Sequence, residues 1–218
     1  MESRSTPRPK REPAVRRTHP RTREAPSDGN GARVTSVAPH VSPGARDPLE
    51  HCRALIRDVP DFPTPGILFK DITPLLANPR AFHIVLDSIA ERYIGQHVDA
   101  IVGIEARGFI FGAALADRLG VGFVPVRKPG KLPFRSARET YALEYGQDTL
   151  EMHEDAVEGR RCVIVDDLLA TGGTAAATAR LIARQGGIVL GFAFLIELTF
   201  LPGRKALGDR PVESIIQY

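Results

Sequence analysis

Apolar residues after position 48 follow two patterns along the chain. Short continuous apolar runs are typical of strands buried on both faces, and apolar residues at spacings of three and four are typical of amphipathic helices. Because the two kinds of run alternate, the chain predicts βαβ units around a buried, mainly parallel sheet flanked by helices, an α/β fold. The predicted strands cover 100–104, 121–126, 161–165 and 188–198, and the predicted helices cover 49–59, 79–94, 109–119 and 174–185.

Two stretches do not fit this alternation. Residues 61–74 are too rich in proline for a helix or a central strand, yet too apolar for a solvated linker. They predict a structured loop with apolar anchors, of the kind that often lines a site. Residues 127–148 are polar and contain glycine, proline and clustered charge, which predicts an excursion that is partly a hairpin. Within it, 131–144 has few apolar anchors and predicts a mobile lid that excludes water.

The first 48 residues have a different composition from the rest. They carry 10 of the 29 Lys and Arg residues, 5 of the 26 Asp and Glu residues and 8 of the 18 prolines, but no Leu, Ile, Phe, Tyr or Trp. Such a segment cannot bury enough apolar surface to offset its chain entropy, so we expect a disordered basic tail over 1–48 and one folded domain over 49–218. The formal charge of +3 therefore combines a basic tail with a slightly acidic domain, and it is poor evidence for nucleic-acid binding.

Several classes of protein are disfavoured by what the sequence lacks. No apolar run approaches the ~18 residues of a membrane helix, and no apolar segment follows the basic start as in a signal peptide. The two cysteines, Cys52 and Cys162, cannot form a disulfide framework, and no Cys/His cluster has zinc spacing. We therefore expect a cytoplasmic domain of the size of an enzyme, with no membrane or nucleic-acid partner.

The most informative stretch is a strand end followed by a turn of small residues. The predicted strand 161–165 leads into Asp166 and Asp167, and the turn 170–174, Ala-Thr-Gly-Gly-Thr, opens the next helix. Ligands of open parallel sheets bind outside the carboxyl ends of the strands, and free N–H groups at such a turn can hold a phosphate. Carboxylates beside a phosphate require a bridging group, such as a pair of sugar hydroxyls or hydrated Mg²⁺. The turn lacks GxxxxGK[ST] and GxGxxG, which disfavours P-loop hydrolases and dinucleotide-binding proteins.

Basic residues follow the two preceding strands. Arg107 and Gly108 come after 100–104, and Arg127, Lys128 and Lys131 come after 121–126. Cations placed at the ends of adjacent strands would stabilise a leaving group that gains negative charge in the transition state.

The stretch 163–174 resembles the phosphoribosyl diphosphate (PRPP) motif of the type I phosphoribosyltransferases. The resemblance implies that Asp166 and Asp167 bind the ribose hydroxyls of PRPP. It also implies that the 5-phosphate is held by the residues of the turn, Ala170, Thr171, Gly172, Gly173 and Thr174. The basic residues Arg107, Arg127, Lys128 and Lys131 would then bind the pyrophosphate, which carries Mg²⁺ rather than a metal held directly by the protein.

Three further segments, 62–74, 105–109 and 141–146, extend the resemblance to the adenine phosphoribosyltransferases over essentially the whole of 49–218. That family makes AMP and pyrophosphate from adenine and PRPP, usually as a homodimer. The resemblance implies a small base-binding hood from the N-terminal loop, in which Phe69 stacks on adenine, backbone groups of Leu68 and Lys70 read its edge and Leu198 closes the other side. It also implies that Glu144 exchanges a proton with adenine and that Arg107 takes part in catalysis. Without the resemblance, nothing distinguishes Glu144 from Glu139 as the proton carrier.

Two alternatives share this type of domain. A PRPP-sensing regulator would need a folded DNA-binding module, which the apolar-poor tail does not supply. An enzyme acting on xanthine, hypoxanthine or orotate would favour a fixed side-chain donor in the base pocket, which the apolar Leu68, Phe69 and Leu198 do not offer.

Overall fold

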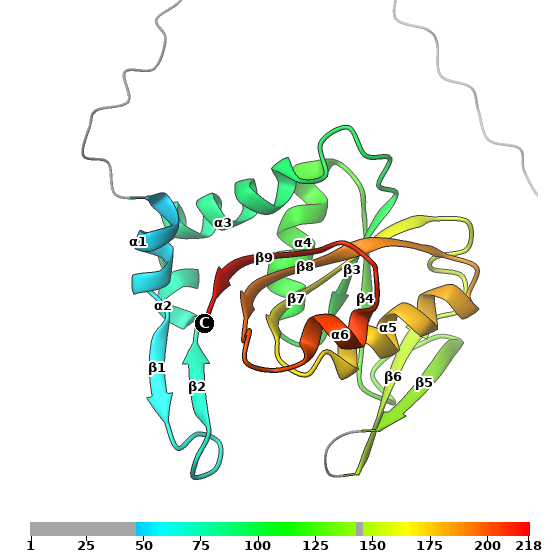
Figure 1. Cartoon of the computed structure of the whole chain (residues 1–218). Coiled ribbons are helices and arrows are strands. Elements are labelled where there is room, and N and C mark those ends of the chain that lie inside the picture. Colours follow the sequence, from blue (N-terminus) through cyan, green and yellow to red (C-terminus); the bar gives the residue numbers. More distant parts are fainter. Residues whose placement is uncertain (1–46, 143–145) are drawn as a thin grey trace, which may run out of the picture. The chain divides into compact units, whose positions relative to one another are not determined.

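The computed structural model describes residues 47–142 and 146–218 (Figure 1). The tail predicted over 1–48 falls outside the described residues up to position 46, and so does Glu144. The domain boundary at 48/49 therefore stays a prediction.

A five-stranded sheet forms the centre of the described domain. All four neighbouring pairs in it are parallel, which confirms the predicted α/β class. The third of the predicted strands is longer than expected, because residues beyond Val165 continue to pair with the next strand as far as Leu169 and Glu197. The order across the sheet is β4 (Gly122–Val126), β3 (Ala100–Ile104), β7 (Arg161–Leu169), β8 (Ile188–Glu197) and β9 (Val212–Gln217).

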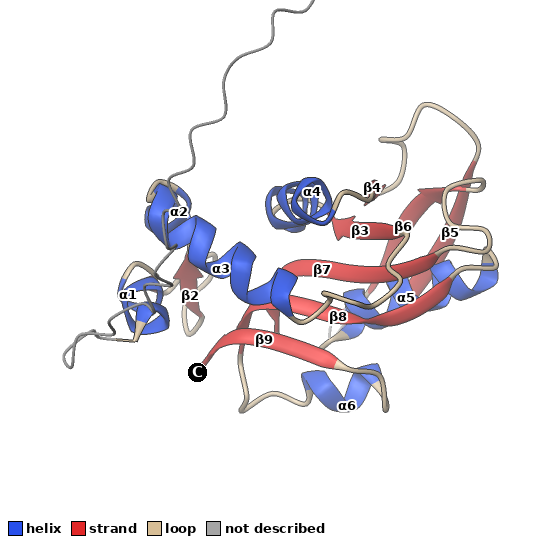
Figure 2. Cartoon of the chain, turned by 90° about the horizontal axis from the view of Figure 1, so that it is seen from above, coloured by secondary structure: helices blue, strands red, loops and turns tan. Residues whose placement is uncertain are grey.

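Helices cover both faces of the sheet (Figure 2). Successive side chains of a strand point to opposite faces, so Ile101 packs into one hydrophobic core and Val102 into the other. One face is covered by α3 (Pro79–Glu91) and α4 (Gly108–Leu119), and the other by α5 (Gly173–Arg184). These helices confirm the helical pattern read over 79–94, 109–119 and 174–185, with boundaries moved by one to three residues.

The N-terminal part of the domain corrects two sequence predictions. The helix expected over 49–59 stops early, as α1 (Pro48–Ala54), and β1 (Arg57–Pro60) follows. The loop expected over 61–74 contains β2 (Leu68–Asp71) and the start of α2 (Thr73–Leu76). The error arose because β1 and β2 pair antiparallel with each other, a contact that local periodicity does not reveal. Their sheet has only two strands, so Pro60 lies on an edge, where a missing N–H is tolerated.

The polar excursion is a hairpin, as the sequence predicted in part. It consists of β5 (Ser136–Ala142) and β6 (Gln147–His153). Residues 136–142 of the predicted lid are thus a paired strand rather than a loop. Glu139 attaches this hairpin to α5, because its buried carboxylate contacts Arg180 at 2.7 Å and Arg184 at 2.8 Å.

Beyond β8, no element was predicted from the sequence, but the structure contains α6 (Gly203–Leu207) and β9. Glu197, the last residue of β8, attaches both to the sheet. Its buried carboxylate accepts hydrogen bonds from Arg204 Nε at 2.6 Å and Arg204 Nη2 at 2.7 Å, and another from Ser214 Oγ. The hydrogen bonds from Arg204 are the main cause that lowers the pKa of Glu197 below its ordinary value.

We expect Glu197→Gln to lower the free energy of unfolding by about 1–3 kcal/mol, because a buried charged pair loses one partner. A carboxylate whose folded-state pKa is lowered stabilises the protein above its unfolded-state pKa, and this contribution disappears as the pH falls through the folded-state value. The difference between variant and wild type should therefore shrink below about pH 4.5. Urea unfolding at several pH values measures it, with Glu213→Gln, in a partly exposed pair with Arg92, as the control. Equal losses in both variants would contradict this role of Glu197.

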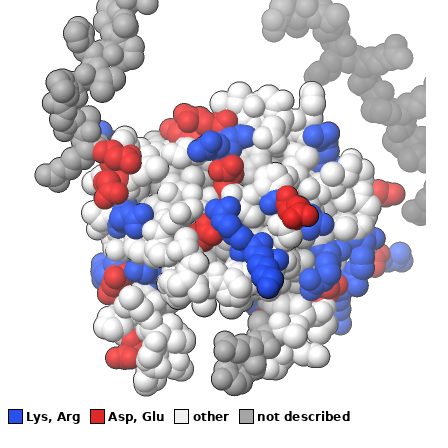
Figure 3. Space-filling view, viewed as in Figure 1, with Lys and Arg blue, Asp and Glu red and all other residues white. Residues whose placement is uncertain are grey.

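Basic and acidic side chains are intermingled on the face seen in Figure 3. This agrees with the nearly balanced charge that the sequence gives to the part of the chain after the tail. Both cysteines are free and buried. Among residues 47–142 and 146–218, no helix is long and apolar enough to cross a membrane.

Candidate active site

The site lies where the strand order of the central sheet reverses. The chain leaves β3 toward β4 on one side, whereas β7 continues to β8 on the other side. Such a switch point leaves a crevice outside the carboxyl ends of β3 and β7, the usual ligand site of open α/β sheets. Arg107 follows β3 and Asp167 lies near the end of β7, so the residues predicted from separate segments meet here.

An ion pair joins the two sides of this crevice. Arg107 Nε lies 2.7 Å from Asp167 Oδ2, and the Asp167 side chain is only 8% exposed. Burial raises the pKa of Asp167, and the Arg107 charge opposes that rise. Burial, followed by the neighbouring Asp167 charge, raises the pKa of Asp166 well above its ordinary value. Two carboxylates thus face the site beside one guanidinium, an arrangement that favours hydroxyl groups as ligands of the acids.

The turn after β7 forms a separate small concavity. Gly172 has φ +79°, a backbone conformation that favours glycine, and a Cβ there would lie 2.6 Å from the Gly203 carbonyl oxygen. Both the backbone conformation and the lack of space therefore require glycine at this position. The turn leads into the N-terminus of α5, where backbone N–H groups and the helix dipole favour an anion. The concavity has a volume of about 90 Å³ and is lined by residues that include Ala170, Thr171, Gly172, Gly173 and Thr174.

The basic residues after β4 gather around an acid to which the sequence analysis gave no role. Glu105 accepts hydrogen bonds from Arg127 Nε at 3.2 Å and from the Lys128 N–H at 3.1 Å, and it pairs with Lys131 Nζ. Although partial burial opposes ionisation, the hydrogen bonds from Lys131, Lys128 and Arg127 lower the pKa of Glu105. Glu105 directly follows β3, and this position at a strand end was the signal that could have identified it.

The predicted base-binding residues lie on β2 and after β8. The Phe69 ring lies 5.0 Å from the Arg107 guanidinium carbon, which places an aromatic face beside the ion pair. Leu68 is 52% exposed, and the Lys70 ammonium is held by Asp58 at 2.6 Å and by the face of the Tyr218 ring at 3.7 Å.

Tyr218 links the two segments of this predicted base site. Its N–H donates to the Glu197 carbonyl oxygen at 2.9 Å, directly before Leu198, while its ring packs against Lys70. The sequence gave no sign of this residue, because the contact joins β2 to the region after β9.

One cavity of about 290 Å³ brings most of the predicted groups together. Its wall includes the Arg107–Asp167 ion pair, the neighbouring acid of Asp167 and the second basic residue after β4, Lys128. The other two basic residues after β4, Arg127 and Lys131, are not among its lining residues. Tyr141 and Asp148, which the sequence analysis did not assign to the site, also line it. The predicted residues in its wall are Arg107, Lys128, Asp166, Asp167 and Thr174.

No group of three or more His, Cys, Asp or Glu side chains within 47–142 and 146–218 is arranged to hold a metal ion. The two carboxylates at the end of β7 could still contact a hydrated ion that arrives with an anionic substrate.

Comparison with known proteins identifies the class that this fold and site define. A model described as "Phosphoribosyl transferase domain" matches residues 72–211, which include β3, β7 and the turn that follows β7. The class is therefore that of the phosphoribosyltransferases.

Relatives define the family more narrowly. The chain is 60% identical to an adenine phosphoribosyltransferase of Sorangium cellulosum, over 78% of this chain and 88% of the relative. It is 61% identical to another from Solibacter usitatus, over 76% and 96%. The crystal structure of the enzyme from Thermoanaerobacter pseudethanolicus has a TM-score of 0.76 at 56% identity, covering 78% of this chain and 99% of that one. The yeast enzyme, solved with adenine and an iminoalditol bisphosphate, has a TM-score of 0.73 at 42% identity, covering 77% and 98%. The chain belongs to the adenine phosphoribosyltransferase family.

Proposed function

We propose that this protein transfers the 5-phosphoribosyl group of PRPP to adenine, giving AMP and pyrophosphate. The observation that carries the proposal is the single cavity in which Asp166, Asp167 and Thr174 face Arg107 and Lys128. PRPP combines a sugar diol with two anionic groups, the 5-phosphate and the diphosphate. The cavity offers two carboxylates for the diol, and these lie between the turn proposed to bind the 5-phosphate and the two cations proposed to bind the diphosphate.

The cations would act on the leaving group. As the bond from ribose C1 to the pyrophosphate oxygen lengthens, positive charge develops on the sugar ring and negative charge on the pyrophosphate. Arg107 and Lys128 would stabilise that negative charge more in the transition state than in the ground state, which is the requirement for catalysis. Arg127 and Lys131 pair with Glu105 in this structure. They would add to the positive charge around the pyrophosphate if they exchanged Glu105 for the pyrophosphate as their ion-pair partner.

Adenine would lie against Phe69, since a flat purine packs well on an aromatic face. The 5.0 Å contact of Phe69 with Arg107 supports this placement, because Arg107 pairs with Asp167, and the base would then lie close to the carboxylate proposed to bind the ribose. Leu68, Lys70 and Leu198 stay proposed base-site residues, the backbone of the first two reading the edge of adenine.

Mg²⁺ is proposed to enter with PRPP and to neutralise part of the charge of its diphosphate. The family resemblance also implies a homodimer, and the composition of the sequence predicts a cytoplasmic protein without a nucleic-acid or membrane partner. All of these stay predictions.

Product analysis tests the function directly. Purified protein with PRPP and Mg²⁺ is given adenine, hypoxanthine, xanthine or orotate in turn, and nucleotide formation is followed by chromatography. AMP from adenine is the expected result, with turnover of the other bases at least tenfold slower. The reason is that the proposed base-site side chains Leu68, Phe69 and Leu198 offer no hydrogen-bond donor to an oxo group of the other bases. No AMP, or faster turnover of hypoxanthine, would overturn the proposal.

A second experiment concerns Glu144, whose proposed role rests on the family resemblance. We expect Glu144→Gln to lower kcat by about 10²–10⁴-fold, the usual contribution of a positioned acid–base group, with little change in adenine affinity. Steady-state kinetics for both substrates measure this, and Glu139→Gln distinguishes the two acids of the segment. A greater loss of kcat in Glu139→Gln would assign the proton to Glu139 instead, against the present expectation that its ion pairs with Arg180 and Arg184 are structural.

A further inference from the structure

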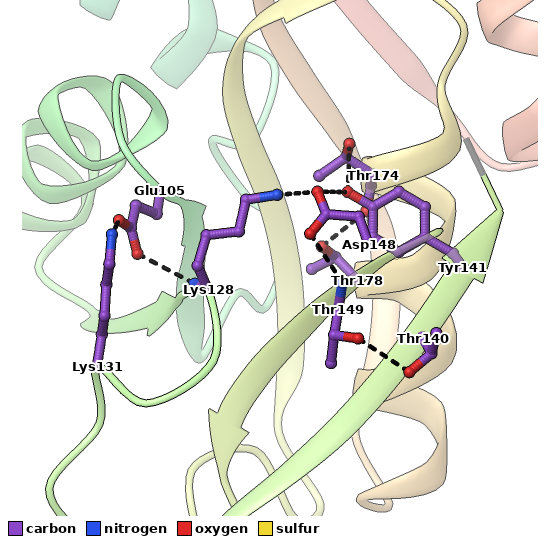
Figure 4. A network of polar contacts seen from close by, with 9 residues as sticks. All are labelled: Glu105, Lys128, Lys131, Thr140, Tyr141, Asp148, Thr149, Thr174 and Thr178. Carbon is purple, nitrogen blue, oxygen red and sulfur yellow. Dashed lines mark hydrogen bonds and ion pairs between the residues drawn. The ribbon is translucent and has the colours of Figure 1, made fainter. Parts of the chain in front are cut away.

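Asp148 lies in the wall of the active-site cavity without a place in the proposed chemistry. Its carboxylate accepts from the Lys128 ammonium and, at 3.2 Å, from the Tyr141 hydroxyl, and the Thr149 N–H donates to its other oxygen at 2.8 Å (Figure 4). Although burial opposes ionisation, the hydrogen bonds from Lys128 and Thr149 lower the pKa of Asp148. Asp148 thus adds negative charge to a cavity that Glu105, Asp166 and Asp167 also line, which is unexpected in a site for an anionic ligand.

The contacts of Asp148 continue to the phosphate-binding turn. Tyr141 lies directly opposite Asp148 in the hairpin, and its hydroxyl is 3.0 Å from Thr174 Oγ1. The Thr174 carbonyl in turn accepts from Thr178 Oγ1 at 2.9 Å inside α5 (Figure 4). Side chains of the hairpin therefore connect the cation after β4 with the first turn of α5, from the pyrophosphate end of the site to the 5-phosphate end.

The Lys128 ammonium gains a defined position from this carboxylate. A lysine side chain has a flexible four-carbon stem and loses considerable rotamer entropy when a ligand immobilises it. Asp148 fixes the ammonium before a ligand arrives, and only one of its three N–H donors is needed for that hydrogen bond. The Lys128 side chain is 39% exposed and lines the cavity, which leaves its other donors available to a ligand there.

We propose that Asp148 is a positioning residue of the pyrophosphate subsite. It orients Lys128 toward the cavity and, through Tyr141, ties that orientation to Thr174 at the 5-phosphate turn. This inference rests on the proposed function, since it requires the cavity to bind PRPP. It adds the reason for a carboxylate among the cations: the cost of its negative charge is offset because the lysine it holds is already ordered when the anion binds.

The test compares variants by the KM values of the two substrates. Asp148→Ala is expected to raise the KM for PRPP about tenfold, in line with the entropy of freeing a lysine side chain, and to leave the KM for adenine within about twofold. Asp148→Asn, whose amide oxygen still accepts from Lys128 and Tyr141, should give a smaller increase. Asp155→Ala is the matched control, because Asp155 is an exposed acid beyond the end of β6. A KM for PRPP that is unchanged or lowered in Asp148→Ala would overturn the proposal.

A double-mutant comparison shows whether Asp148 acts through Lys128. Lys128→Met combined with Asp148→Ala should match Lys128→Met alone within about twofold, whereas independent roles would multiply the two effects. Multiplied effects, or equal increases in the KM for adenine and PRPP, would contradict a positioning role. If Asp148→Ala does not fold, Asp148→Asn with Lys128→Met provides the same comparison.

Calorimetry with sodium pyrophosphate and Mg²⁺ separates this inference from the proposed function. If the wild type makes no AMP but binds pyrophosphate, the function fails, and weaker binding in Asp148→Ala still supports the positioning role. If the wild type makes AMP and the variant binds pyrophosphate as tightly as the wild type does, the positioning role alone fails.

Discussion

Replacing Arg107 with alanine is expected to lower kcat/KM for PRPP by about 10²–10³-fold, the usual cost of removing one preorganised group that faces developing charge. Two contacts of the structure would be lost, together with the proposed contact to pyrophosphate. Asp167 would keep its buried carboxylate without the guanidinium 2.7 Å away, Phe69 would lose its cationic neighbour, and the leaving pyrophosphate would lose a charge. Because the charge on pyrophosphate grows toward the transition state, most of the loss should appear in kcat.

Steady-state kinetics with each substrate varied in turn measure this effect. Arg118→Ala, on the helix α4 that follows Arg107, is the control, because Arg118 pairs with Asp87 at 2.9 Å and does not line the cavity. Arg107→Lys should recover only part of the activity, since an ammonium keeps the charge but not the planar donor group that reaches Asp167. A kcat/KM within about threefold of the wild type in Arg107→Ala would exclude Arg107 from catalysis.

The second large effect is expected from Gly108→Ala, a change of one methyl group at the start of α4. A Cβ at Gly108 would lie 2.7 Å from the Val165 carbonyl oxygen and 2.8 Å from Asp166 Oδ1. Both distances are too short for carbon, so α4 or the end of β7 must move. We expect a loss of about 1–3 kcal/mol of stability from overpacking. A displacement of the acidic pair by about 1 Å would also lower kcat/KM for PRPP by about 10²-fold.

Gly122→Ala is the matched control, because a Cβ there would have its nearest neighbour at 3.7 Å, an ordinary contact. Thermal unfolding and PRPP kinetics are measured for both variants under the same conditions. Wild-type stability and kinetics in Gly108→Ala would show that the close approach of α4 to β7 is not needed to position Asp166.

The sequence and the structure agree best where the information is local. The strand 100–104 and the helix that ends before Gly120 were read from apolar periodicity and from one glycine, which has φ +67° in the structure. The acids and the turn after β7 were recognised because they form one contiguous motif. Their meeting with Arg107 followed from parallel strands, whose carboxyl ends lie at the same edge of a sheet.

The hairpin of β1 and β2 shows why other features were missed. Residues 57–60 continue the helical spacing of the preceding segment, but pairing of Val59 with Phe69 makes them a strand. Within the part of the chain that the structure describes, β9 pairs with β8 alone, and Glu197 and Arg204 support that pairing. At 57–60, long-range pairing outweighed the local helical preference.

By itself, then, the sequence determined the α/β class, the order of the main elements and the motif that surrounds Asp166 and Asp167, because apolar spacing and small-residue turns act within a few residues. Only the tertiary structure decided which charges meet: Glu105 with the cations after β4, and Asp148 with Lys128. Those ion pairs depend on distances between side chains from different elements. Such distances are fixed by how strands and helices pack, which no local pattern contains.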